Sequence, residues 1–233
     1  DPEGTIEVVA DRGGAATLSG GSRLGPVVAS AAAAEAMDRA DEFGVAAVGV
    51  HDSNHLGMLG YYTDQLLQAG YVGLGITNTE PAMPPYGGTE SVLGTNPIAI
   101  GLPTDPAFNL DMSTSGIARG TVLHYSETGQ ELPEGVALDA DGRPTTDPDA
   151  ALEGTILPFG GAKGSGLAIA VEVLAGGLVG AAMGSDVTGT YHTEDPCTKG
   201  DLFVAIDPEA LGVPDFGEQA SAFLADLTAG EPA

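Results

Sequence analysis

The stretch GVAAVGVHDSNHLGMLGYYTDQLLQAGYVGLGIT, residues 44–77, contains two apolar runs separated by a polar loop and a helical segment. The runs 44–50 and 71–77 are apolar on both faces, as in buried strands of the parallel type. Residues 61–70 place apolar side chains on one face of a short helix that ends at Gly70. A strand, a helix and a strand within about 30 residues form a βαβ unit. The stretch therefore predicts an α/β fold.

The rest of the chain fits this fold class. We expect an edge hairpin or irregular strands over residues 6–18, and a helix from Pro26 to about Phe43 that is capped by Gly44. Further strands and helices are predicted, in order, at PIAIGLP (97–103), FNLDMS (108–113), the apolar segment opened by PFGGAKGSG (158–166), LFVAID (202–207) and EQASAFLADLTAG (218–230). The order of the strands in the sheet does not follow from the sequence.

Two long stretches lack the periodicity of helices or strands. Residues 77–97 are rich in proline, glycine and threonine, and a loop of this length in a compact domain usually has a function. Residues 125–156 are polar and acidic, and LDADGRPTTDPDAALEG within them suggests turns.

The charge balance is strongly acidic, with 33 acidic against 7 basic residues and a formal net charge of −26. Nucleic-acid binding is excluded on this ground, because phosphate contacts need clustered lysine and arginine. The acidic residues are scattered along the whole chain, which suits a solvated surface in high salt, where self-repulsion is screened. We therefore favour a halophilic source, with an ordinary acidic cytosolic protein as the alternative.

The remaining bulk features concern redox state and location. Cys197 is the only cysteine, so an intrachain disulfide and a cysteine-based zinc site are both ruled out. No basic, apolar signal peptide opens the chain, and we expect a cytoplasmic protein. Residues 164–183 are long enough to span a membrane, but Glu172 lies in their middle and no basic residue follows. We favour a buried helix packed on the sheet.

His55 follows the first buried strand, in the sequence SNHLG. An imidazole can accept or donate a proton near neutral pH, so His55 is a candidate acid/base, with Ser53 and Asn54 able to orient a ring or a substrate oxygen. The alternative is a histidine that merely bonds a loop carbonyl. His51 is four residues away, but in a loop and without an evident third ligand, so we expect no metal site.

Lys163 lies in GGAKGSG, just before the apolar helix. Free N–H groups at a helix start, together with a lysine, can hold a phosphate or carboxylate. Lys163 is one of two lysines in the chain, which hints at a function, although a plain helix cap is equally consistent. Neither a GxxxxGK[ST] loop nor a GxGxxG fingerprint after an N-terminal strand is present.

The segment LDMSTSGIARG, residues 110–120, has three hydroxyl-bearing residues after Asp111 at a strand end. Such a turn can hold a phosphate or ribose. It is also typical of a capped helix start. A hydrolase that uses Ser113 or Ser115 with His55 and Asp111 can be imagined, but it lacks the GxSxG elbow.

Several of these stretches, taken in order, resemble the malate/L-lactate dehydrogenase family of NAD(P)-dependent oxidoreductases, which is distinct from the Rossmann-type lactate and malate dehydrogenases. The stretches are SNHLGMLGYY (53–62), ITNTEPAMPPYGGTESVLGTNPIAIGLP (76–103), LDMSTSGIARG (110–120), LPEGVALDADGRPTTDP (132–148) and LPFGGAKGSGLAIAVEVLAG (157–176). The resemblance implies an α/β, non-Rossmann nucleotide-binding domain with a mixed sheet flanked by helices. It also implies a homodimer with active sites near the subunit boundary, NAD or NADP as cofactor, and a small 2-hydroxy or 2-oxo acid, or an imine acid, as substrate.

The resemblance also implies roles for single residues. His55 matches the family histidine that acts as acid/base at the carbonyl carbon being reduced. The positions that match cofactor contacts are Thr79, Ser113, Thr114, Ser115, Lys163 and Gly164. Asn96 lies in another family motif, LGTNP, and no role can be assigned to it from the sequence.

Two parts of the family pattern have no counterpart here. An N-terminal segment with SHG and a nearby arginine, which helps to form the substrate pocket, is absent, as is the C-terminal PGE-type segment. We therefore expect residues 1–233 to form mostly one cofactor-binding domain of a longer protein. The alternative to an active 2-hydroxyacid dehydrogenase is a catalytically incomplete fragment that binds cofactor and dimerises.

Overall fold

The computed structural model describes residues 3–189 and 194–230, and its centre is a mixed sheet of seven strands. The order of strands is β1-β2-β3-β9-β4-β5-β6. Their bounds are β1 Glu7–Arg12, β2 Ala15–Arg23, β3 Val45–Ser53, β4 Val72–Thr77, β5 Ile98–Leu102, β6 Phe108–Met112 and β9 Asp201–Ile206. The mixed sheet and the α/β class agree with the sequence prediction.

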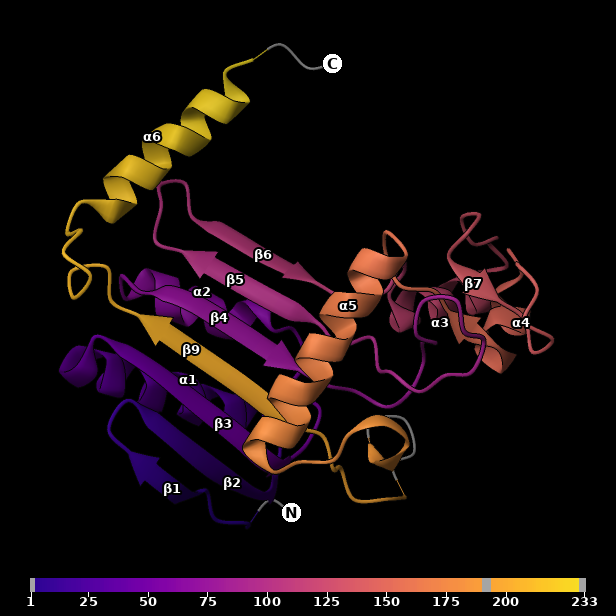
Figure 1. Cartoon of the computed structure of the whole chain (residues 1–233), viewed down its shortest axis with the longest axis horizontal. Helices are drawn as coiled ribbons and strands as arrows, with labels where there is room; N and C mark the ends of the chain where they lie inside the picture. The colour runs from indigo at the N-terminus through magenta and orange to yellow at the C-terminus, as the bar shows by residue number, and fades with distance from the viewer. Residues whose placement is uncertain (1–2, 190–193, 231–233) are drawn as a thin grey trace.

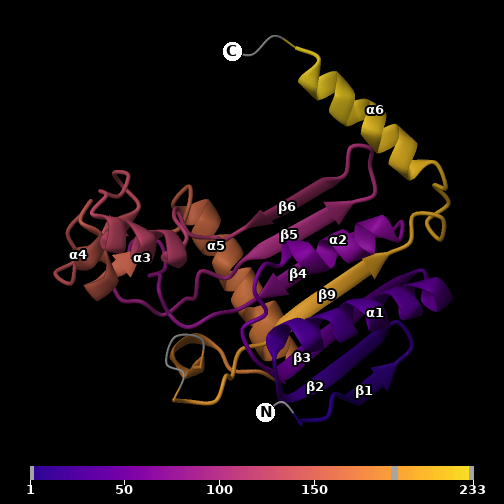
Figure 2. The same cartoon turned by 180° about the vertical axis from the view of Figure 1, so that it is seen from behind.

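Helices cover both faces of the sheet (Figures 1 and 2). The helices α1 (Gly25–Phe43) and α2 (Gly60–Gln68) lie on one face, and α5 (Ala162–Val171) crosses the other. A smaller unit beyond the strand ends holds α3 (Arg119–Thr128), β7 (Ala137–Leu138), α4 (Pro148–Glu153) and β8 (Thr155–Ile156). The last helix, α6 (Phe216–Thr228), projects away from the sheet and has no buried residue (Figure 1).

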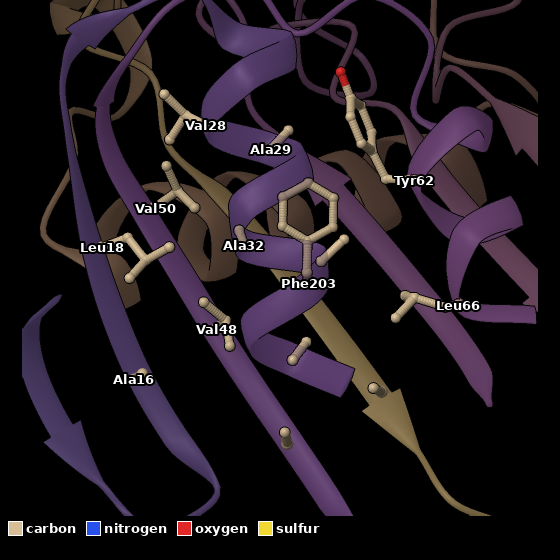
Figure 3. Close-up of a cluster of buried hydrophobic side chains, with 14 of the residues drawn as sticks. Ala16, Leu18, Val28, Ala29, Ala32, Val48, Val50, Tyr62, Leu66 and Phe203 are labelled. Atoms are coloured by element: carbon tan, nitrogen blue, oxygen red, sulfur yellow. The ribbon is translucent and has the colours of Figure 1, made fainter. Parts of the chain in front are cut away.

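The main core lies between α1 and the sheet. Figure 3 shows Val28, Ala29 and Ala32 of α1 over Val48 and Val50 of β3. The alanine-rich face of α1 has small side chains, which let the helix approach the strands closely. Tyr62 of α2 and Phe203 of β9 meet edge to face with ring centroids 5.6 Å apart and complete this core.

The βαβ prediction for residues 44–77 is confirmed with one refinement. β3 and β4 are parallel to each other, but both pair antiparallel with β9, which lies between them. Because β9 comes from residues 201–206, more than a hundred residues later in the chain, no local pattern could place it there. Gly44 caps α1 in the left-handed conformation at φ 79°, as predicted.

Two further predictions need correction or detail. The stretch 125–156 is more regular than a series of turns, because it contains the end of α3, the whole of α4 and two short paired strands. These elements pack as a second hydrophobic cluster around Val122 and Ile156, so their few apolar side chains suffice to order them. The hairpin at the start of the chain is confirmed, although β2 runs on to Arg23.

The apolar segment is a helix that lies against the sheet. α5 continues as a π-helical turn (η1, Glu172–Gly176) and a 3-10 turn (η2, Gly177–Val179), and η3 (Gly184–Asp186) follows. By length and composition, Ala162–Val179 is the one helix among the described residues that could cross a membrane. Its side chains Val171, Ala175 and Val179 instead pack on the sheet in a third hydrophobic cluster.

Candidate active site

The candidate site lies at the C-terminal ends of three strands of the sheet that run parallel to one another. β3, β4 and β6 point the same way, because β9 and β5 run antiparallel between them. His55 comes two residues after β3, Thr79 two residues after β4, and Ser113 directly after β6. At about 4.8 Å per strand, neighbouring loops of this set are separated by roughly 10 Å. One extended ligand could therefore contact all three loops.

His55 is held by its own loop. The backbone N–H of Gly57 donates to Nδ1 of His55 over 3.1 Å. Asn54 anchors the loop to the end of β2, since its Nδ2 donates to the carbonyl oxygens of Ser22 (2.9 Å) and Arg23 (2.7 Å). His55 as a residue is exposed although its ring is partly covered by its neighbours, so a ligand can still reach the ring.

The electrostatic surroundings of His55 favour the neutral ring. Partial burial of the ring is the main cause that lowers the pKa of His55 below 6.5, and the ammonium of Lys199 lowers it further, while the carboxylate of Asp201 opposes both. The bond from Gly57 acts in the same direction, because a protonated Nδ1 could not accept it. The neutral ring then carries its proton on Nε2.

The loops after β4 and β6 are bonded to each other through Thr95. The N–H of Thr95 donates to Oγ1 of Thr79 over 3.0 Å. The carbonyl oxygen of Thr95 accepts from both the N–H and the Oγ1 of Thr114, each at 2.9 Å. Thr114 is fully buried, so its hydroxyl shapes this turn from inside. The structure thus brings together two loops that the sequence analysis assigned separately to the cofactor.

The hydroxyls of Ser113 and Ser115 also bond each other, with Oγ atoms 2.8 Å apart. Ser115 is buried and donates to the carbonyl oxygen of Ile117 over 2.7 Å, whereas Ser113 is half-buried. A hydrolytic triad is not assembled here, because Asp111 accepts from the N–H of Gly60 (2.7 Å) and Nδ1 of His55 is already occupied. The hydrolase alternative has no support in this geometry.

Lys163 and Gly164 form the start of α5 next to the serine turn. A Cβ on Gly164 would lie 2.1 Å from the carbonyl oxygen of Phe159, so only glycine permits this approach. The N–H of Phe159 in turn donates to the carbonyl oxygen of Thr114 over 3.1 Å, which ties the helix start to the turn. Lys163 is exposed and makes no salt bridge within the part of the chain that the structure describes.

A cavity of about 340 Å³ opens beside this helix start, and neither His55 nor Lys163 lines it. Its walls include Tyr86, Pro158 and the glycines Gly160 and Gly161, whose bare backbone allows a ligand to come close. A free ammonium, helix N–H groups and an accessible serine hydroxyl are the donor set that a phosphate-bearing ligand requires. No group of three metal-ligating side chains is found in residues 3–189 and 194–230.

Two features of the site were not identified from the sequence. Glu172, in the π-helical turn, is buried and accepts from Nδ2 of Asn78 (2.9 Å) and Nδ2 of Asn96 (2.7 Å). Oδ1 of Asn96 in turn accepts from the N–H of Thr79 over 3.2 Å, so Asn96 helps to position the loop that carries Thr79. A carboxylate in an apolar helix was a usable signal, but its two partners are 94 and 76 residues away.

The second missed feature is a buried ion pair between Lys199 and Asp201, at the start of β9. The scarcity of lysine that singled out Lys163 applied equally to Lys199. The rarity of lysine did not point to Lys199 as a site residue, because the sequence alone does not show that the strand after it, β9, lies beside β3.

The comparison with solved structures places this mixed α/β fold among dehydrogenases. The chain matches sulfolactate dehydrogenase from Methanocaldococcus jannaschii with a TM-score of 0.93 and 45% identity, over 100% of this chain and 68% of that one. A model of the family described as malate/L-lactate dehydrogenase matches residues 1–233, and the chain belongs to this family.

Two curated relatives extend the comparison. L-sulfolactate dehydrogenase from Methanothermobacter thermautotrophicus is 48% identical over 227 residues, which is 97% of this chain and 67% of the relative. (2R)-3-sulfolactate dehydrogenase (NADP(+)) from Chromohalobacter salexigens is 42% identical over 177 residues, which is 74% of this chain and 53% of the relative. The chain thus spans about two thirds of the first relative and about half of the second.

Proposed function

We propose that the protein is an NAD(P)-dependent oxidoreductase that transfers a hydride between a nicotinamide and the C2 atom of a 2-hydroxy or 2-oxo acid. The observation that carries the proposal is the convergence of His55, Thr79, Ser113 and the start of α5 at one edge of the sheet, in a chain of the malate/L-lactate dehydrogenase family. The nicotinamide, when bound, supplies or accepts the hydride.

The chain's own residues then divide into two groups. Lys163 and the N–H groups at the start of α5 hold a phosphate, while Thr79 and the turn 113–115 shape the rest of the cofactor surface. His55 serves the substrate oxygen. With Gly57 on Nδ1, the neutral ring presents Nε2–H to the carbonyl oxygen of a 2-oxo acid. In reduction, release of Gly57 lets Nδ1 take up a proton from solvent, and the imidazolium then gives its Nε2 proton to the substrate oxygen. In oxidation the transfer runs in reverse, and Nε2 of a ring protonated on Nδ1 accepts the hydroxyl proton.

The relatives guide the choice of substrates to test. Sulfolactate dehydrogenases among the relatives make a sulfonated 2-oxo acid the first substrate to test, with malate, lactate and cyclic imine acids next. NAD and NADP are both candidates. A homodimer in the cytoplasm remains our prediction for the assembly and its location.

The proposal is tested with His55→Gln in the full chain, with His124→Gln as control, because His124 is an exposed histidine on α3 whose ring lies beside Tyr125. Reduction of a panel of 2-oxo acids is followed by the absorbance of the reduced nicotinamide, with both cofactors and in high salt. We expect His55→Gln to lower turnover by about 10²- to 10⁴-fold with little change in cofactor affinity. Full turnover by His55→Gln would refute the role of His55.

A second candidate function is a cofactor-binding, dimerising fragment without catalysis. It would need only the serine turn and the start of α5, which the N–H of Phe159 and the carbonyl oxygen of Thr114 tie together. Binding of reduced nicotinamide without any turnover of the substrate panel, even at high protein concentration, would support this second function over the first.

A further inference from the structure

The inference concerns the Lys199–Asp201 pair, which is buried at the start of β9. Nζ of Lys199 lies 2.6 Å from Oδ1 of Asp201, and the side chains are 2% and 0% exposed. The other carboxylate oxygen, Oδ2 of Asp201, is buried without a hydrogen-bond partner among the described residues. A buried ion pair with an unsatisfied oxygen adds little to the free energy of unfolding, because the cost of desolvating both charges offsets their attraction. Stability alone therefore does not explain why the pair is present.

The sheet fixes where this pair lies. Asp201 is directly opposite Val50 of β3 on one side and Thr77 of β4 on the other, which places it between the strands that lead to His55 and Thr79. The residue between the pair is held from several sides: the N–H of Gly200 donates to Oδ1 of Asn78 (2.8 Å), and its carbonyl oxygen accepts from Oγ1 of Thr77 (3.0 Å). The two charges therefore have little freedom to move.

Burial lowers the pKa of His55 most, the ammonium of Lys199 lowers it further, and the carboxylate of Asp201 raises it. Other titratable groups lie on elements packed near the loop, and each is engaged elsewhere: Tyr62 donates to the carbonyl oxygen of Leu56, Asp111 accepts from Gly60, and His51 pairs with Asp52. Arg23, at the end of β2, contacts the loop through its carbonyl oxygen, which accepts from Asn54.

We propose that Lys199 and Asp201 are positioning residues that set the electrostatic field at His55 from their place between β3 and β4. Lys199 opposes a second proton on the ring, and Asp201 limits that effect. The inference deepens the proposed function, because His55 is the group proposed to serve the substrate oxygen. Its central measurement, the titration of His55, needs neither substrate nor cofactor, so the two proposals can fail separately.

The experiment is an NMR titration of the histidine Cε1–H signals in the full chain, with the His55 signal assigned by its loss in His55→Gln. We expect Lys199→Met to raise the pKa of His55 and Asp201→Asn to lower it. Both variants break the same ion pair, so a merely structural role would move the pKa in one direction. Shifts of the His55 pKa in opposite directions in the two variants would show that the two charges act on the ring electrostatically.

Two controls complete the series. Lys199→Arg keeps the charge and should keep the pKa of His55. Arg39→Met removes a positive charge from another ion-paired site, where Arg39 contacts Asp11 and Glu35, and should leave His55 unchanged.

Shifts of the same sign in Lys199→Met and Asp201→Asn, or no shift in either, would overturn the inference. If either single variant fails to fold, the double variant Lys199→Met/Asp201→Asn decides, because it leaves no unpaired buried charge. Its His55 pKa should exceed that of the unaltered chain, since the effect of Lys199 is larger than that of Asp201. An unchanged or lower value in the double variant would count against the proposal. If the His55 pKa shifts as expected in these variants but the unaltered chain turns over none of the substrates, the inference stands and only the proposed function fails.

Discussion

Asn96 and Glu172 meet inside the molecule, where Nδ2 of Asn96 donates to Oε2 of Glu172 over 2.7 Å across 76 residues of sequence. Asn96 is fully buried and has φ 33°, in the left-handed region that asparagine tolerates better than most residues. Through this contact, the helix on one face of the sheet holds the loop that carries Thr79. The buried carboxylate thus has a structural task at the candidate site.

The first prediction follows from the hydrogen bonds of Glu172, which also accepts from the N–H of Gly184 over 3.0 Å. Glu172→Gln replaces one acceptor oxygen by a donor amide, which cannot pair with an asparagine Nδ2. We expect a loss of about 1.5–3 kcal/mol in the free energy of unfolding, measured by urea denaturation. Glu153→Gln, on the exposed end of α4, is the matched control and should change little. Equal stability of the two variants would contradict the assigned role.

The second prediction concerns the charge of Lys163. Lys163→Met should weaken binding of reduced nicotinamide by about 10- to 100-fold, because one charge-assisted contact to phosphate is worth about 1.5–3 kcal/mol. The measurement is a fluorescence titration of the cofactor at low salt. Arg143→Met removes an exposed cation that pairs with Asp141, and it should leave cofactor affinity unchanged. Unaltered affinity in Lys163→Met would place the phosphate elsewhere.

The third prediction uses two glycines of the same helix. A Cβ at Gly164 would meet the carbonyl oxygen of Phe159 at 2.1 Å, whereas nothing lies within 4 Å of one at Gly166. We expect Gly164→Ala to destabilise the chain by about 1–3 kcal/mol through forced displacement of the helix start. Gly166→Ala should be neutral or stabilising by up to about 1 kcal/mol, since alanine favours helix. Thermal denaturation of both variants checks the pair, and similar melting points would refute the close approach.

Most of the fold could be predicted from local pattern. The two-sided apolar runs of β3 and β4, Gly44 as a helix cap and the apolar periodicity of α1 all act within a few residues, and the structure has them as expected. α3 and α4 were not predicted: α4 has only six residues, and most of α3 is not buried. α3 has a single buried residue, Val122, so the tertiary cluster that orders it leaves little trace in the sequence.

The site could be predicted only as separate loops. That Thr79, Thr95 and Thr114 form one bonded set depends on the order of β4, β5 and β6 in the sheet, which local pattern does not encode. The Lys199–Asp201 pair depends in the same way on the insertion of β9 between β3 and β4. The roles of these residues in binding and proton exchange remain predictions.

The fourth prediction concerns pH. Because the pKa of His55 is lowered from 6.5, the folded ring stays neutral at pH values where the unfolded ring is already protonated. The unfolded state then binds more protons, so this group's contribution to stability falls as the pH drops below about 6.5 and is constant above it. For oxidation of a 2-hydroxy acid, kcat/KM should stay flat down to about pH 6.5 and decline only below it. A decline centred above pH 6.5 would contradict the lowered pKa, and His55→Gln should lack this limb of the profile.

The fifth prediction concerns salt. With a net charge of −26, acidic side chains along the whole surface repel one another, and this repulsion is screened as the Debye length falls from about 10 Å at 0.1 M to about 3 Å at 1 M. We expect Tm to rise steadily when KCl is increased from 0.1 M to about 2 M. Sucrose serves as the control, because it favours compact states by exclusion but screens no charge. If sucrose raises Tm and KCl leaves it unchanged or lowers it, surface repulsion is not limiting, and the proposal of a halophilic source loses its physical basis.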